Sequence, residues 1–144
     1  MRSETECRVE GVRKAVRTGG FEDVGGYARA VRIGEIVAVS GTAATGDGGV
    51  ALFPGDAYAQ TREAFERALA ALAELGVGVE DVIRTRIFLV AGSNWRRAID
   101  AHRELFDGVR PANTTLFVAG FIPEGVVVEV EVDAVVARDA GQIT

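Results

Sequence analysis

The sequence has 144 residues, of which 48% are hydrophobic, and a formal net charge of −5. This length and apolar content fit one domain whose core is large enough to fold without disulfide bonds. The acidic balance argues against a nucleic-acid partner, because basic patches supply most nucleic-acid affinity. Cys7 is the single cysteine and the opening segment has no apolar run, so we expect a cytoplasmic protein with no internal disulfide and no membrane partner.

The chain shows no change of composition that would mark a second domain. We expect a partly disordered leader over residues 1–12, a single domain over residues 13–137 and a C-terminal tail over residues 138–144. Alternating apolar positions predict a short first strand over residues 13–17.

The next strand patterns cover residues 27–31 and 36–40, and the short connection around Gly34 is consistent with a hairpin. Residues 41–49 are rich in glycine but lack the lysine spacing of a nucleotide-binding loop. This segment is therefore predicted to be a turn or a mobile flap.

A helix is predicted from Asp56, which suits the N-cap, to about Leu75, and Gly76 supplies a stop. Apolar residues recur at three and four residue steps and predict one buried stripe: Tyr58, Thr61, Phe65, Ala68, Leu69, Leu72 and Leu75. The opposite side carries two charged pairs at helical spacing: Glu63 with Arg67, and Arg62 with Glu66.

Residues 82–90 predict a strand with two distinct faces. One face would hold Ile83, Thr85, Ile87 and Leu89, and the other Arg84, Arg86 and Phe88. A second helix is predicted over residues 95–106, capped by Ser93 or Asn94. Its apolar stripe would consist of Trp95, Ala98, Ile99, His102, Leu105 and Phe106.

Residues 108–136 contain two strand patterns joined by a Pro-Gly turn. Three carboxylates, Glu129, Glu131 and Asp133, occupy alternate positions of the second strand, so they share one face while the valines share the other. So long and valine-rich a strand is predicted to be central in the sheet. We expect Arg84 and Arg86 to lie on the acidic face and to form at least one close ion pair there.

The order of these patterns predicts an α+β fold, a two-layer domain with a mixed sheet of about six strands and two helices packed on one face. The opposite sheet face would still carry apolar residues among its charges. Such a face is best buried against copies of itself, so the sequence predicts an oligomer.

Three segments, taken in order, resemble the reactive intermediate deaminase (Rid) superfamily. They read GYARAVRIGEIVAVSGTAAT, PGDAYAQTREAFERALAALAELGVGVEDVIRTRIFLV and RPANTTLFVAGFIPEGVVVEVEVDAVV, within residues 24–136. The resemblance implies a chorismate-mutase-like fold and a homotrimer with small-molecule clefts between subunits. It also implies a cofactor-free hydrolysis of reactive imines or enamines to ketones and ammonia.

The resemblance also implies site residues. The family's cleft tyrosine falls on Tyr27, its serine before a glycine on Ser40, and its water-positioning glutamate on Glu129. The small residue of its P-A-R-S/T-x segment falls on Thr115, and an asparagine that active members often carry falls on Ile99.

One departure from the family's pattern concerns the substrate. The P-A-R-S/T segment reads Pro-Ala-Asn-Thr here, with Asn113 at the position of the arginine that grips the substrate carboxylate. Asparagine is neutral and lacks the guanidinium fork. The sequence therefore resembles the branch without this arginine, and we expect weak activity on amino-acid-derived imines.

Several of these residues also have a purely structural interpretation. Glu129 would simply pair with Arg84 or Arg86, and Asn113 would cap a strand. His102 is the only histidine, and its place on an apolar stripe favours a hydrogen-bonded core or interface histidine over a catalytic base; it is kept as a candidate ligand contact. One histidine and one cysteine predict no metal site.

Two classes of function remain. The first is a Rid-like hydrolase of a small imine or enamine, in which Glu129 orients water and Tyr27, Ser40 and Asn113 shape the pocket. The second is a non-catalytic trimeric module that binds or senses a small molecule. A ribonuclease role, also attached to the family, is disfavoured by the acidic charge.

Overall fold

The computed structural model describes residues 13–137. Its strands are β1 (Arg13–Val16), β2 (Ala30–Ile33), β3 (Ile36–Ala43), β4 (Val82–Val90), β5 (Ala112–Val118) and β6 (Val128–Val135). Its helices are α1 (Phe21–Gly25), α2 (Ala57–Glu74) and α3 (Trp95–Phe106), with 3₁₀ turns η1 (Asp47–Gly49) and η2 (Val79–Asp81). The leader and tail expected over residues 1–12 and 138–144 lie outside the described residues.

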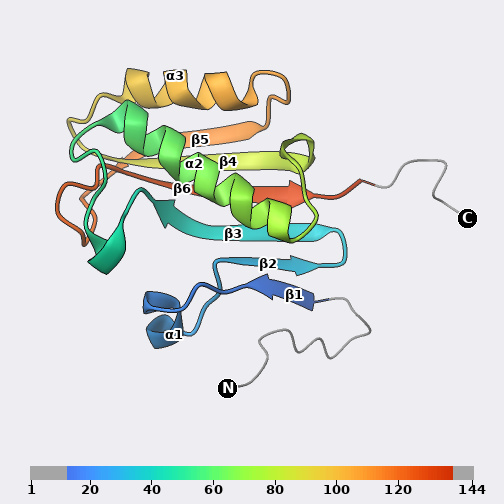
Figure 1. Cartoon of the computed structure of the whole chain (residues 1–144). Helices are drawn as coiled ribbons and strands as arrows, with labels where there is room; N and C mark the ends of the chain where they lie inside the picture. Colours follow the sequence, from blue (N-terminus) through green and yellow to red (C-terminus); the bar gives the residue numbers. More distant parts are fainter. Residues whose placement is uncertain (1–12, 138–144) are drawn as a thin grey trace, which may run out of the picture.

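The strands form one mixed sheet in the order β1-β2-β3-β6-β4-β5, and the long helices α2 and α3 lie across one of its faces (Figure 1). This confirms the predicted two-layer α+β fold. β6 lies between β3 and β4, so the valine-rich strand is central, as predicted. β5 is an edge strand parallel to β4. The two C-terminal strands therefore do not form a hairpin, because β4 separates them.

The ends of both long helices follow the local sequence. The Asp56 carboxylate accepts a hydrogen bond from the Ala59 amide at 3.0 Å, and the Asn94 side chain accepts one from Arg97 at 3.4 Å. Gly76 follows α2 with a φ of 74°, a left-handed conformation that glycine adopts without strain. The predicted caps are confirmed, and they fix where each helix begins and ends.

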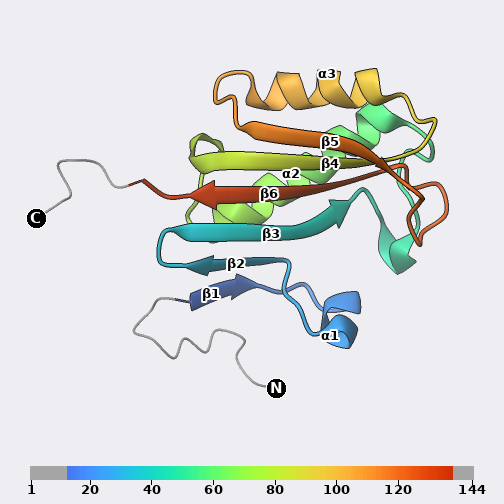
Figure 2. The same ribbon diagram turned by 180° about the vertical axis from the view of Figure 1, so that it is seen from behind.

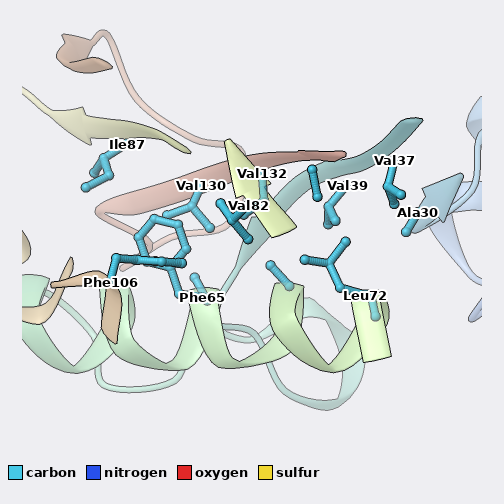
Figure 3. Close-up of a cluster of buried hydrophobic side chains, with 14 of the residues drawn as sticks. Ala30, Val37, Val39, Phe65, Leu72, Val82, Ile87, Phe106, Val130 and Val132 are labelled. Atoms are coloured by element: carbon cyan, nitrogen blue, oxygen red, sulfur yellow. The ribbon is translucent and has the colours of Figure 1, made fainter. Parts of the chain in front are cut away.

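The core lies between the helices and the sheet (Figure 3). Side chains from α2 and α3, among them Phe65, Leu72 and Phe106, pack against the valines of β3 and β6. Along β6, Val128, Val130, Val132 and Ala134 are buried, while Glu129, Glu131 and Asp133 point to the other face and are half-buried. The predicted alternation of this strand is confirmed.

The predicted face of Ile83 in β4 is wrong. The pairing of β4 with β6 shifts between Val82 and Arg84, so Ile83 is 52% exposed while Val82 is buried. A β-bulge of this kind inserts one residue and reverses the alternation on one side of it. From Arg84 onward the prediction holds, and Arg86 pairs with Asp133 at 2.9 Å on the face opposite the helices.

Gln60 in α2 ties two loops to the core. Its side chain is fully buried, and its Nε2 lies within 3.1 Å of the carbonyl oxygens of Leu52, Phe53 and Gly125. Its Oε1 accepts from the Val127 amide at 2.9 Å. This one side chain thus anchors both the segment before α2 and the segment before β6.

We expect Gln60→Leu to lower the free energy of unfolding by roughly 2–4 kcal/mol, because the Leu52 carbonyl and the Val127 amide lose the hydrogen bonds that Gln60 supplies, while Phe53 and Gly125 keep those from Asp56 and Gly55. Chemical denaturation measures the loss. Glu66→Gln, at an exposed position of the same helix, is the control, and its effect should stay within about 0.5 kcal/mol. Equal stability of Gln60→Leu and the wild type would contradict this role.

The sheet face opposite the two long helices is open in the described chain (Figure 2). Ile36 is 68% exposed and Leu116 is 41% exposed.

Among residues 13–137, no helix combines the length and apolarity needed to cross a membrane.

Candidate functional site

The first group of candidate residues gathers around the middle of β3 and the start of β6. The Ser40 hydroxyl donates to the carbonyl of Ala28 at 2.7 Å, and the Ser40 amide donates to Arg29. The backbone just after Tyr27 therefore lies beside Ser40, and the Tyr27 side chain is 42% exposed. Ser40 uses its hydroxyl proton to hold this segment.

Glu129 lies against the backbone of Gly41. A Cβ added at Gly41 would fall 2.0 Å from Glu129 Oε1, so the carboxylate occupies space that glycine leaves open. Arg29 holds the same corner, since its Nη2 donates to the Gly41 carbonyl at 2.6 Å. In the described chain the buried Nε of Arg29 has no hydrogen-bond partner. Ser40, Gly41, Arg29 and Glu129 thus form one continuous polar corner.

The electrostatics of this corner favour a carboxylate that can exchange a proton. Burial raises the pKa of Glu129 above its ordinary value of 4.5, the positive charge of Arg29 lowers it, and the negative charge of Glu131 raises it again. Burial is the largest of these causes, so the pKa is raised overall. A general base works best when its pKa approaches the working pH.

The raised pKa predicts a pH dependence of stability. A carboxyl group with a raised folded pKa stabilises the folded state below its unfolded pKa, and this contribution is lost as the pH rises through the folded value. We expect Glu129→Gln to melt at a higher temperature than the wild type at pH 7.5, with the gap narrowing toward pH 4.

Thermal melts of both proteins across this range measure the gap. Glu124→Gln removes one carboxylate from an exposed loop and corrects for the change in net charge. A gap that widens toward acid would contradict the raised pKa.

The second group lies at the edge of the sheet, under α3. The Thr115 hydroxyl donates to Asn113 Oδ1 at 2.8 Å, and Asn113 Nδ2 donates to Thr85 Oγ1 at 3.0 Å. Thr85 Oγ1 lies 2.7 Å from His102 Nε2. Three of the candidate residues, Asn113, Thr115 and His102, are therefore linked through Thr85 in one chain of hydrogen bonds.

A pocket of about 390 Å³ opens beside Asn113 and Thr115, between α3 and β5. No charged side chain lines it, and apart from these two residues its walls are apolar: Leu89, Trp95, Ile99, Leu116 and Phe117. The pocket is thus suited to a small ligand with an apolar part and a few neutral hydrogen-bonding groups.

The two groups lie on opposite faces of the sheet. Asn113 is in register with Thr85, whose side chain is buried beneath the helices. Glu129 is in register with Phe88, which points to the other face because successive strand residues alternate. Within one chain, Glu129 and Asn113 therefore do not line the same cavity.

Arg29 and Thr85 belong to these groups although the sequence alone did not single them out for this role. Arg29 follows Tyr27 by two residues in the segment GYARAV, which was the available signal. Thr85 precedes Asn113 by 28 residues, and the parallel pairing of β4 and β5 brings them together. In the part of the chain that the structure describes, no group of three or more His, Cys, Asp or Glu residues could hold a metal ion.

Comparison with known proteins matches residues 20–136 to the family described as endoribonuclease L-PSP. An uncharacterized protein of Streptomyces coelicolor is 46% identical over 125 residues, 87% of this chain and 92% of that protein. The crystal structure of Rv2704 from Mycobacterium tuberculosis, described as a member of the YjgF/YER057c/UK114 family, superposes with a TM-score of 0.76 at 41% identity. The alignment covers 86% of this chain and 99% of that one. A Yersinia pestis protein described as belonging to the conserved Rid family gives a TM-score of 0.73 at 27% identity, with coverages of 86% and 99%.

Proposed function

The chain belongs to the endoribonuclease L-PSP family, also called the YjgF or Rid family, and from this premise we propose that it acts as a homotrimer with small-molecule clefts between its subunits. The observation that carries the proposal is the division of the site. Glu129 and Asn113 lie on opposite sheet faces of one chain. A shared cleft then requires the Glu129 face of one subunit to meet the Asn113 edge of its neighbour.

The uncovered sheet face supports the same arrangement. Ile33 on β2 is 45% exposed and pairs in register with Ile36 on β3, which is 68% exposed. Leu116 on β5 is 41% exposed beside Phe88. Burying such apolar area stabilises an interface by about 25 cal/mol per Å², so a face of this kind favours association.

We expect a trimer of about three times the 15.2 kDa chain mass at micromolar concentration, measured by mass photometry or light scattering. Leu116→Glu, on the uncovered face, should shift the population toward the monomer. Val50→Glu, at a 67% exposed position away from the sheet, is the matched control and should remain trimeric. A wild-type protein that is entirely monomeric at this concentration would contradict the proposal of a shared cleft.

The chemistry we propose is the hydrolysis of a small reactive imine. Glu129 takes a proton from water while the oxygen adds to the C=N carbon, and the protonated Glu129 then gives this proton to the nitrogen. The carbinolamine then loses ammonia and leaves the ketone. Arg29 stabilises the ionised form of Glu129 and so keeps it available as a base at neutral pH. Tyr27 and Ser40 form the wall of this half of the cleft.

The substrate we propose carries no carboxylate at the position that Asn113 contacts. The neutral lining of the pocket beside Asn113 supports this choice. A carboxylate bound there would lose its hydration shell, and no positively charged side chain lines the pocket to compensate for that loss. Amino-acid-derived imines are therefore poor substrates of this chain.

The experiment that tests this function is a hydrolysis assay of the purified protein on two sets of N-unsubstituted imines, generated in situ by oxidation of small amines without a carboxylate, which give neutral imines, and of amino acids. Faster release of ammonia from the neutral set is the expected result. Binding of an amine or carbonyl ligand without turnover would instead favour a non-catalytic sensing module. Cleavage of RNA would favour the ribonuclease role, which the net charge of −5 disfavours.

A further inference from the structure

We propose that Thr85 and His102 are positioning residues that fix the side-chain amide of Asn113, so that the adjacent pocket recognises small neutral amides and rejects carboxylates. The inference deepens the proposed function, because it concerns the Asn113 half of the same cleft. It names the chemical class of ligand that this half accepts.

The direction of each hydrogen bond follows from the orientation of the Asn113 amide and from the tautomer of His102. Asn113 Nδ2 can only donate, so Thr85 Oγ1 accepts from it at 3.0 Å. The single hydroxyl proton of Thr85 is then free to be donated to His102 Nε2, 2.7 Å away. At the other end, Thr115 donates its hydroxyl proton to Asn113 Oδ1 at 2.8 Å. Every donor in this arrangement points from Thr115 toward His102, and the tautomer that we infer for it is a neutral His102 protonated at Nδ1.

The inner end of this chain is held rigidly. Thr85 is fully buried. The His102 ring lies against two phenylalanine rings, with centroids 5.5 Å from Phe65 and 4.8 Å from Phe106. Burial also lowers the pKa of His102, which keeps the ring neutral near pH 7. With the Thr85 proton donated to His102, Asn113 has one satisfied orientation, because a flipped amide would turn its oxygen toward an oxygen with no free proton.

The outer end presents a donor beside an acceptor. One N–H of Asn113 Nδ2 is used on Thr85, and the second has no protein acceptor among the described residues. The Thr115 oxygen, having donated its proton, keeps lone pairs that can accept. Asn113 and Thr115 both line the pocket, whose other walls are apolar.

A neutral amide matches this pair, because its carbonyl accepts from Asn113 while its N–H donates to Thr115. A carboxylate offers two acceptors and a negative charge. One of its oxygens would face the Thr115 oxygen, and no cation lines the pocket to compensate for the lost water. The site therefore discriminates between two ligands of nearly the same shape.

Benzamide and benzoate are suitable probes because they differ in little except this group. We expect the full-length trimer to bind benzamide at least roughly tenfold more tightly than benzoate, measured by calorimetry or by NMR titration. Thr85→Val keeps the side-chain shape but removes the hydroxyl, and should weaken benzamide binding by roughly three- to tenfold with benzoate unaffected. Thr85→Ser restores the hydroxyl and should restore the affinity.

A spectroscopic measurement tests the relay without any ligand. The ¹⁵N shifts of the His102 ring should show the Nδ1-protonated tautomer in the wild type and in Thr85→Ser. In Thr85→Val this preference should be lost. The tautomer of the wild-type protein remains decisive even if Thr85→Val fails to fold.

Benzoate binding as tight as benzamide binding, or a wild-type His102 protonated at Nε2, would overturn the inference. Its failure is distinct from failure of the proposed function. Loss of the benzamide preference in a trimer that still hydrolyses imines would refute only the amide-recognition inference. The benzamide preference in a trimer without hydrolysis would support it while refuting the catalytic proposal.

Discussion

Glu129→Gln is expected to slow the hydrolysis of neutral imines by at least roughly 100-fold, because a positioned general base typically contributes 10²–10⁴. The substitution keeps the shape of the side chain but removes its ability to take a proton from water. Binding of a carbonyl product should change little. The loss should therefore appear in kcat rather than in KM. Wild-type kcat in a folded Glu129→Gln trimer would show that another group activates the water.

Gly41→Ala provides a second test that leaves the chemistry of Glu129 intact. The added Cβ would lie 2.0 Å from Glu129 Oε1, so the flexible end of the glutamate must move. Gly41 does not have a positive φ, so alanine imposes no backbone strain there. We expect a loss of roughly tenfold or more in kcat with a small change in melting temperature, since a displaced base no longer reaches the water. Gly108→Ala is the control, because Gly108 also lacks a positive φ and no atom lies within 4 Å of its added Cβ.

Asn113→Arg is expected to raise the rate of hydrolysis of amino-acid-derived imines by roughly 10- to 100-fold. A charge-assisted hydrogen bond to a carboxylate contributes about 1.5–3 kcal/mol, and each 1.36 kcal/mol corresponds to tenfold in rate. The same variant should reduce hydrolysis of neutral imines. Asn113→Lys adds the charge without the guanidinium fork and should gain less.

The Asn113→Arg result separates two explanations of poor activity on amino-acid-derived imines. No gain in a correctly assembled trimer would mean that Ile99 and Thr115, the other departures from the family's pattern, matter as much as Asn113. Wild-type turnover equal to that of an arginine-bearing family member would contradict the poor activity itself.

Local signals in the sequence were sufficient for most of the fold. Caps and periodicity located α2 and α3, because Asp56 and Asn94 satisfy amide groups within their own first turns. Alternation correctly assigned the two faces of β6. The bulge at Ile83 was not predictable, because it depends on how β4 pairs with β6 and leaves the local apolar pattern unchanged. The position of β5 beside β4 was not predictable for the same reason, because the chain crosses from β4 through α3 to reach β5 and this path leaves no local pattern in the sequence.

For the site, the sequence supplied candidate residues but not their grouping. Glu129 and Asn113 are only 16 positions apart in numbering, yet their side chains lie on opposite sheet faces. The chain of hydrogen bonds from Thr115 to His102 joins β5, β4 and α3. Such a network depends on strand register and helix placement together, and neither leaves a local pattern in the sequence.

The most direct test of the shared cleft is complementation between two inactive variants. Glu129→Gln damages one half of the proposed cleft, and Thr115→Trp would fill the other half beside Asn113. Trimers re-formed from an equal mixture of the two variants should recover about one quarter of the wild-type rate, because each cleft takes its two halves from different, randomly drawn subunits. Mixed trimers confirmed by native mass spectrometry that show no recovered hydrolysis would contradict a cleft built from two subunits.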